Sequence, residues 1–226
     1  MKITYYGHSC FSVNVMGKKL LFDPFITPNS LAKDINIADI EADYILLSHA
    51  HEDHIADADA IALSTGATII SNYEIAMWYA AKGIKNYHPM NHGGKWTFDF
   101  GTVKCVNAVH SSSLPDGNYG GNPMGFIIQS DEKNFYYSGD TALTLDMQLI
   151  PMFAKIDFSV LPVGDNFTMG LDDAAAAAKM VKSDTVIGVH YDTFGFIKID
   201  HEKAKNIFKN NDLKLLLPAI GETIDV

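Results

Sequence analysis

The chain has 226 residues, 47% of them hydrophobic, with 17 basic and 27 acidic side chains. A chain of this size can bury one substantial core, which favours a single domain over residues 1–226. The formal net charge of −10 offers no basic surface to a phosphodiester backbone, so we expect no nucleic-acid partner.

Cysteine usage and hydropathy point to the cytoplasm. Cys10 and Cys105 each lie in an apolar, strand-like run, without Cys-x-x-Cys spacing or the framework of a disulfide-rich protein. The sequence opens directly on a strand pattern, and it shows no charged-then-apolar leader and no apolar run of about 18 residues. We therefore expect a cytoplasmic protein that does not contact a membrane.

The first half of the chain predicts a hairpin sheet followed by alternating strands and helices. Period-two alternation of apolar residues, bounded by turn residues, predicts its strands. These strands are expected at residues 2–6, 10–15, 19–23, 44–47 and 67–70. One helix is expected over 55–63, where Gly66 ends it, and a second runs from a cap at Ser71 or Asn72 to near Gly83.

The second half predicts mostly strands. They are expected at residues 96–100, 102–109, 125–129, 134–137, 157–163 and 185–189. An Ala-rich helix is expected over about 172–182, and residues 111–123, rich in Ser, Gly, Asn and Pro, are expected to form a loop over a site. Two successive sets of strands, each with helices, predict a layered α/β sandwich with the helices outside.

The most informative segment is His49-Ala50-His51-Glu52-Asp53-His54. An extended turn lets His49 and His51 face one point, whereas Asp53 and His54 turn toward a second point nearby. Imidazole and carboxylate ligands suit zinc, manganese, iron or nickel. The segment therefore predicts a pair of divalent metal ions, in preference to a solvated polar loop.

Three further candidate ligands stand where other predicted strands end. They are His110, Asp140 and His190. Four ligands from one loop cannot complete two coordination spheres, so residues from elsewhere in the chain are needed. Strand ends that share one edge of the fold would bring these three to the His49 loop. His88, His92 and His201 are interpreted as surface residues.

These residues resemble, in order and approximate spacing, the metallo-β-lactamase superfamily. That family has a four-layer αβ/βα sandwich, with two mixed sheets between outer helices, and a dinuclear metal site. Further segments resemble the small bacterial metal-dependent hydrolases related to L-ascorbate-6-phosphate lactonase. They are Gly7-His8-Ser9-Cys10-Phe11, Asp23-Pro24-Phe25, residues 164–170 and residues 190–194. The resemblance covers the whole chain and implies the same α/β fold.

The resemblance also implies a ligand set. The first metal takes His49, His51 and His110, the second takes Asp53, His54 and His190, and Asp140 bridges them. His8 and Asp23 match positions that orient the ligands through hydrogen bonds, which ligand histidines usually need. For His8, a purely structural role is an equally good interpretation.

The implied chemistry is metal-dependent hydrolysis. A metal pair, expected to be zinc, would lower the pKa of a bridging water and provide hydroxide as the nucleophile on a small ester, lactone or phosphoester. Asp53 and His54 are the candidate catalytic residues, and the leaving group takes its proton from metal-bound water or from Asp53. No Gly-x-Ser-x-Gly nucleophile motif is present.

Four polar residues next to the ligands are candidate substrate contacts. They are Ser111, Asn166, Thr168 and Tyr191. Turn chemistry or capping is the competing interpretation for each, and Asn166 and Thr168 precede a helix expected from Leu171, where capping is the simpler explanation. Met169 is interpreted as a core residue.

A function of a different class is also compatible with these patterns. The chain could be a non-enzymatic, metal-dependent protein that binds or senses a metabolite and has kept the fold. The complete ligand set weighs against this alternative, because a decayed site should have lost at least one ligand. The expected partner is a small-molecule substrate, and the resemblance is compatible with a homo-oligomer.

Overall fold

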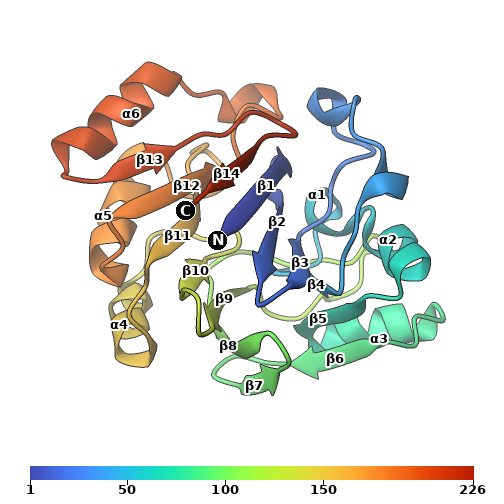
Figure 1. Cartoon of the computed structure of the whole chain (residues 1–226). Helices are drawn as coiled ribbons and strands as arrows, with labels where there is room; N and C mark the ends of the chain where they lie inside the picture. The colour runs from blue at the N-terminus through green and yellow to red at the C-terminus, as the bar shows by residue number, and fades with distance from the viewer.

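The computed structural model describes residues 1–226, and its first sheet has seven strands in the order β14-β1-β2-β3-β4-β5-β6 (Figure 1). Their bounds are β1 Lys2–Gly7, β2 Cys10–Val15, β3 Lys18–Phe22, β4 Tyr44–Leu46, β5 Thr68–Asn72, β6 Tyr87–Met90 and β14 Thr223–Asp225. Pairing is antiparallel from β14 to β3 and parallel from β3 to β6. The sheet is therefore mixed, and its first and last strands in sequence, β1 and β14, lie side by side.

The second sheet also has seven strands, in the order β13-β12-β11-β10-β9-β8-β7. Their bounds are β7 Lys95–Phe98, β8 Gly101–Asn107, β9 Met124–Gln129, β10 Phe135–Tyr137, β11 Phe158–Pro162, β12 Thr185–Val189 and β13 Lys214–Leu216. Pairing is parallel from β13 to β10 and antiparallel from β10 to β7. Strands β10 and β11 are buried along their whole length, as expected for strands covered on both faces.

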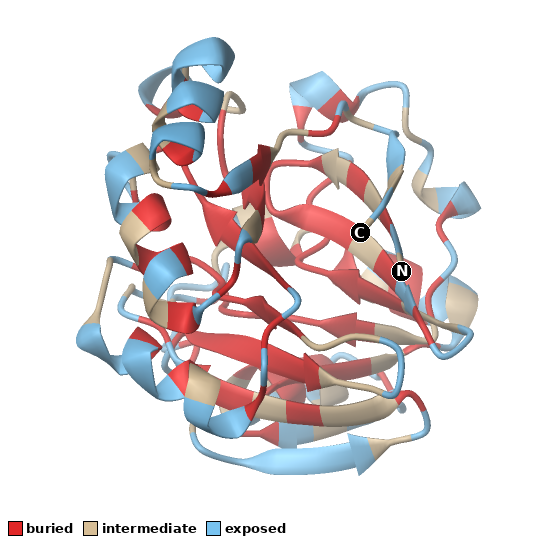
Figure 2. Cartoon of the chain, turned by 60° about the vertical axis from the view of Figure 1, so that its left-hand side comes forward, coloured by how far each residue is buried: buried red, intermediate tan, exposed pale blue.

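Helices cover the outer faces of both sheets. Their bounds are α1 Glu52–Ile55, α2 Ala58–Thr65, α3 Tyr73–Ala81, α4 Ile150–Phe153, α5 Leu171–Val181 and α6 His201–Asn210. Figure 1 shows α1 to α3 on the side of the first sheet and α4 to α6 on the side of the second, and Figure 2 shows buried sheets between helices with exposed outer faces. The predicted αβ/βα sandwich is confirmed. None of these helices has the length and apolar character needed to cross a bilayer.

The two sheets face each other across an aromatic core. Phe22 of β3 stacks on Phe11 of β2, with 4.6 Å between ring centroids. The ring of Phe22 also contacts two rings of the opposite sheet, Phe126 of β9 and Phe135 of β10, with 6.4 and 5.9 Å between the ring centroids. These residues are essentially inaccessible to solvent, so burial of their rings holds the sheets together.

Several elements differ from the sequence-based expectation. The helix expected over 55–63 is two helices, α1 and α2, because the buried carboxylate of Asp57 accepts hydrogen bonds from the backbone of Ile26 and Thr27 at the break. The short 3₁₀ turns, α4, β6, β13 and β14 were not predicted. His88, interpreted above as a surface residue, lies in β6 and is half-buried.

The direction of the strands decides where the site lies. In the first sheet β1, β3 and β4 run the same way, and His8, Asp23 and His49 follow their ends. In the second sheet β8, β10 and β12 run the same way, and their ends precede the three remaining candidate ligands, His110, Asp140 and His190. The backbone N–H of His190 donates to the carbonyl of His8, 2.8 Å away, so the two edges meet.

Candidate metal centre

The ligand-rich loop lies between β4 and the first turn of α1. His51 is the N-cap residue of α1 in an extended conformation, whereas Asp53 and His54 lie within the helix. This change of backbone direction turns the side chains of one short segment toward two points. The hydroxyl of Ser112 fixes the loop from outside, since its Oγ accepts from the Ala50 N–H at 3.1 Å.

The first group of side chains consists of His49, His51 and His110. One potential ligand atom from each lies within 4.8 Å of the others, and His49 Nε2 is 3.0 Å from His51 Nδ1. Burial lowers the pKa of all three imidazoles, most strongly for His49. They are therefore neutral near pH 7, which is the form that binds a metal.

The second group consists of His8, Asp53, His54 and His190, whose ligand atoms also lie within 4.8 Å of one another. The carboxylate of Asp53 is 26% exposed and is the most accessible member. Burial raises the pKa of Asp53, but the charge of His54 and the hydrogen bond from His8 outweigh burial and hold that pKa below its usual range. Asp53 is therefore a carboxylate at neutral pH.

Asp140 lies between the two groups. Its Oδ2 is 2.9 Å from His190 Nε2, 3.2 Å from His54 Nε2 and 3.7 Å from His110 Nε2. Asp140 is buried, which raises the pKa of its carboxyl group, but His190 and His54 lower that pKa by more. A buried carboxylate is thus in reach of histidines from both groups.

The cluster fits divalent metal ions by an observation independent of spacing. His54 Nε2 and Asp140 Oδ1 are buried and have no hydrogen-bond partner; the 3.2 Å approach of His54 Nε2 to Asp140 Oδ2 lacks hydrogen-bond geometry. An unpaired buried polar atom costs roughly 1 to 3 kcal/mol, unless a ligand satisfies it. Imidazole and carboxylate donors without a thiolate suit the first-row ions named above.

Asp23 supports the ligand loop through hydrogen bonds. Its Oδ2 accepts from His54 Nδ1 at 2.8 Å and from the Tyr137 hydroxyl at 2.5 Å, and both its carboxylate oxygens accept from Ser48. Because the Nδ1 of His54 donates to Asp23, its Nε2 is left to face Asp140. This is the orienting arrangement that the sequence predicts for Asp23.

His8 connects the ligand loop to the far wall of the site. Its Nε2 donates to Asp53 Oδ2 at 3.0 Å, and its Nδ1 lies 3.0 Å from the hydroxyl of Thr193. Burial, with the nearby His190, lowers the pKa of His8 to about 4, so this imidazole is neutral at pH 7. His8 belongs to the second group by distance, yet it also has the partners of an orienting residue.

A cavity of about 690 Å³ opens directly over both groups. Its walls include five ligand candidates, which are His51, Asp53, His110, Asp140 and His190. Of the four predicted substrate contacts, only Ser111 lines this cavity, with its Oγ 3.4 Å from His51 Nε2.

The other three predicted substrate contacts lie elsewhere. Asn166 lines a neighbouring hollow, Thr168 is not in the cavity wall, and Tyr191 is buried against Tyr5 with 6.2 Å between ring centroids. The capping interpretation of Asn166 and Thr168 is wrong, since Gly170 is the N-cap residue of α5 and no side chain caps this helix. Met169 is fully buried, as predicted.

Sequence reasoning missed most of the outer cavity wall. That wall contains Phe167 from the loop after β11 and Thr193, Phe194 and Phe196 from the loop after β12. The signal that was available is the occurrence of Phe in loops otherwise rich in Gly, Asp and Thr, where a buried position is not expected.

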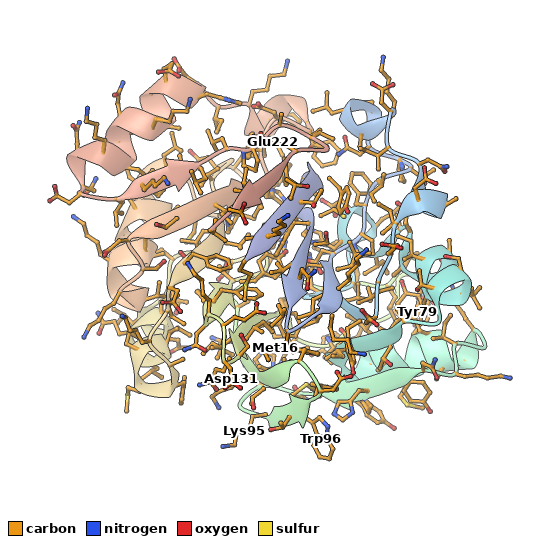
Figure 3. All side chains as sticks on the ribbon, viewed as in Figure 1. Met16, Tyr79, Lys95, Trp96, Asp131 and Glu222 are labelled. Carbon is orange, nitrogen blue, oxygen red and sulfur yellow. The ribbon has the colours of Figure 1, made fainter.

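The surface histidines fall outside the site, as predicted. His92 Nε2 donates to the Pro123 carbonyl at 2.7 Å, and His201 pairs with Asp192 at 2.7 Å. His88 contacts the ring of Trp96, and neither residue lies in the cavity. Figure 3 shows Trp96 and Lys95 on the outlying strand β7.

The comparisons with known proteins agree with this geometry. A model of the beta-lactamase superfamily domain matches residues 2–190. A UPF0173 metal-dependent hydrolase of Christiangramia forsetii is 57% identical, over 100% of both chains. This chain belongs to the UPF0173 metal-dependent hydrolase family. A second member, from Flavobacterium johnsoniae, is 54% identical over 100% of both chains.

A solved structure extends the agreement to three dimensions. Igni18, a metallo hydrolase from Ignicoccus hospitalis, superimposes with a TM-score of 0.88 at 34% identity, covering 99% of this chain and 97% of its own. This UPF0173 chain is thus a metal-dependent hydrolase by family and by fold. Membership favours this class over the non-enzymatic binding protein that the sequence left open.

Proposed function

We propose that this UPF0173 protein hydrolyses a small ester, lactone or phosphoester with two divalent ions, zinc being the first candidate. The first ion would be held by His49, His51 and His110. The second would be held by Asp53, His54 and His190. The observation that carries the proposal is the position of Asp140, whose Oδ2 approaches histidines of both groups within 3.7 Å.

The chemistry divides between the ions and the protein. When bound, such a metal pair supplies a hydroxide nucleophile near neutral pH and polarises the carbonyl or phosphoryl oxygen of the substrate. Asp53 faces the cavity as a carboxylate and can accept a hydrogen bond that orients the attacking water, while its lowered pKa makes it a weak base. His8 holds the Asp53 carboxylate in place through its 3.0 Å hydrogen bond.

Ser111 is the substrate contact that the geometry supports. Its hydroxyl lies in the cavity wall beside His51 and can donate to, or accept from, a polar substrate atom. No other member of the predicted substrate set has this access. The remaining polar surface of the cavity comes from the candidate ligands and Thr193.

The test is to measure metal content and turnover on the same samples. Purified protein loaded with zinc should contain about two ions per chain and should hydrolyse at least one of the three substrate classes. His51→Ala and Asp140→Ala should lower kcat/KM by at least about 100-fold, because loss of even a supporting residue costs roughly 10- to 100-fold. His88→Ala, a histidine outside the cavity, is the matched control and should retain both properties.

Two results would contradict the proposal. One is zinc-loaded protein that contains a single ion per chain and still hydrolyses a substrate of these classes. The other is activity that survives both Asp140→Ala and chelation of the metal.

A further inference from the structure

Three phenylalanine side chains form the rim of the cavity over the metal centre. Phe167, Phe194 and Phe196 all line it and are 50%, 37% and 77% exposed. Phe167 and Phe196 come from different loops and meet edge to face, with 6.2 Å between their centroids. Large aromatic side chains gathered at one opening mark a surface that an apolar group covers.

The same cavity has no basic side chain apart from its histidines. The chain contains no arginine, so all 17 basic residues are lysines, and none of the lysines lines the cavity. Asp53 and Asp140 are its charged acidic side chains. Free carboxylate and phosphate groups on a ligand are usually bound by Arg forks or Lys. The cavity therefore offers no Lys or Arg side chain to an anionic group outside the reacting centre.

The lysines of the neighbouring hollow do not change this conclusion. Lys198 and Lys203 line a neighbouring hollow of about 440 Å³, which Phe196 separates from the cavity and also lines. Three carboxylates, from Asp165, Asp172 and Asp200, line the same hollow. The positive charge there is more than balanced, and an anionic substrate tail gains nothing by reaching it.

We propose that the substrate is an uncharged ester or lactone whose non-reacting part is apolar and planar. This inference rests on the function proposed above. The planar group packs against Phe167, Phe194 and Phe196, while the acyl carbon lies toward the ligand cluster. Water adds to that carbon, the ring or ester C–O bond breaks, and the leaving oxygen takes a proton to give a hydroxy acid or an acid and an alcohol. Phosphorylated or carboxylated lactones are expected to be poor substrates.

The experiment compares matched substrates on the zinc-loaded full chain. Two γ-lactones of equal side-chain length are used, one ending in phenyl and one in carboxylate, and hydrolysis is followed by the proton that the acid product releases. The phenyl lactone should have a kcat/KM at least about tenfold higher, a difference typical of one well-placed apolar contact. An equal or higher kcat/KM for the carboxylate lactone would overturn the inference.

Variants of the rim phenylalanines provide a second experiment. Phe196→Ala should lower kcat/KM for the phenyl lactone by about tenfold, mainly through KM. Phe196→Lys should move the preference toward the carboxylate lactone, which a merely structural role would not do. Met152→Ala is the control, since it removes an equally exposed side chain, 77% accessible, from α4. It should leave kcat/KM unchanged for both the phenyl and the carboxylate lactone. A substrate preference that is the same in all three variants would contradict the proposal.

A binding measurement separates this inference from the proposed function. Phenylacetamide, which is neutral and stable, should show saturation transfer from the zinc-loaded protein in ligand-observed NMR, and acetamide should not. The signal should fall in Phe196→Ala and persist in Met152→Ala. If no lactone is hydrolysed but this pattern holds, the proposed reaction fails and the rim inference stands. If hydrolysis proceeds but the phenyl group confers no binding, the proposed reaction stands and the rim inference fails.

Discussion

At the scale of single residues, the most constrained side chain is a carboxylate that touches no cavity. Asp23 is completely buried and has a φ of +41°, a conformation that non-glycine residues adopt at a cost of roughly 1 to 3 kcal/mol. Four hydrogen bonds, from Ser48, His54 and Tyr137, hold it there. His8 and His190 also have positive φ, 53° and 56°. Three of the nine non-glycine residues with positive φ thus lie where ligands are oriented.

The first prediction concerns the role of Asp23. Asp23→Asn replaces one of the two acceptor oxygens with an NH2 donor, which must face either the Ser48 N–H or the donors His54 Nδ1 and Tyr137, so part of this hydrogen-bond network is lost. We expect zinc affinity to fall by roughly 10- to 100-fold, measured by competition with a chromophoric chelator.

Asp57→Asn is the matched control for this prediction. Asp57 is also buried, but it accepts from the backbone of Ile26 and Thr27 and contacts no candidate ligand. Its variant should lose stability while keeping zinc affinity. Equal zinc affinities in the two variants would show that Asp23 does not act through His54.

At the scale of elements, Asn72 at the end of β5 ties the loop over 111–123 to the first sheet. Asn72 caps α3, since its Oδ1 accepts from the Ile75 N–H at 2.9 Å, and its Nδ2 donates to the Gly120 carbonyl at 2.8 Å. Gly121 must be glycine here, because an added Cβ would lie 2.4 Å from the Asn72 amide. Tyr79 of α3 (Figure 3) continues the connection, donating to the Ile55 carbonyl.

The second prediction separates the two halves of the Asn72 amide. Asn72→Asp keeps the cap on α3 but removes the donor to Gly120, whereas Asn72→Ala removes both and should cost about 1 to 2 kcal/mol of unfolding free energy. In hydrogen exchange, amides of the 111–123 loop should be less protected in both variants. The amides at the start of α3 should lose protection in Asn72→Ala alone, and equal loss there in both would contradict this interpretation.

The third prediction concerns the β7–β8 turn. Gly101 has a φ of +137°, and a Cβ there would lie 2.1 Å from the Gln129 carbonyl oxygen, a backbone atom that cannot move aside. Gly101→Ala should therefore cost about 3 kcal/mol or more, measured by urea unfolding.

Gly17→Ala is its control. Gly17 also has a positive φ, +77°, but nothing lies within 4 Å of the added Cβ. Gly17→Ala should therefore lose only the roughly 1 to 2 kcal/mol that a left-handed backbone costs a residue with a Cβ. If the two substitutions cost the same, close packing against Gln129 is not what requires Gly101.

At the scale of the whole molecule, the candidate ligands come from both sheets, which also meet through packing and through hydrogen bonds from His190 to His8 and from Tyr137 to Asp23. The His49 loop follows β4 of the first sheet, whereas Asp140 and His190 follow β10 and β12 of the second. Any ion held by both sets binds the folded chain but not the unfolded one, so its binding free energy adds to stability.

The fourth prediction follows from this coupling. Free zinc at about 100 times its dissociation constant should add about 2.7 kcal/mol of stability, which raises Tm by roughly 5 to 10 °C for a chain of this size. Differential scanning calorimetry with and without chelator measures the shift. Asp140→Ala should reduce it, and an unchanged Tm in zinc-replete wild type would show that the ions do not bridge the sheets.

Much of the fold and the positions of the ligand candidates were predictable from the sequence. Apolar runs that lead to His49, His110, Asp140 and His190 predict both the strands and the ligand positions, because the end of a strand also fixes the sheet edge at which the following residues lie. Strand β14 gave no such signal. It is three residues long and only partly buried, and it is positioned by pairing with β1 at the other end of the chain.

The cavity wall was less predictable, because its side chains lie in loops. Asn166 has a φ of +53°, and Asp165 before it and Asp192 after the last ligand also have left-handed backbones. Side-chain direction in such turns follows from hydrogen bonds that sequence periodicity does not encode. Proximity in sequence to a ligand therefore placed Ser111 correctly in the wall but not Asn166, Thr168 or Tyr191.

The separation between the ligand-bearing strand ends and the two Phe-bearing loops has a consequence for divergence within the family. Exchange of residues 194–196, or of Phe167, alters the wall that a substrate meets while leaving every candidate ligand in place. Thr193 is the exception, because its hydroxyl touches His8 and through it Asp53. Under the proposed function, substrate range can therefore change at a few loop positions while the candidate ligands are kept, with Thr193 as the position where such a change also reaches Asp53.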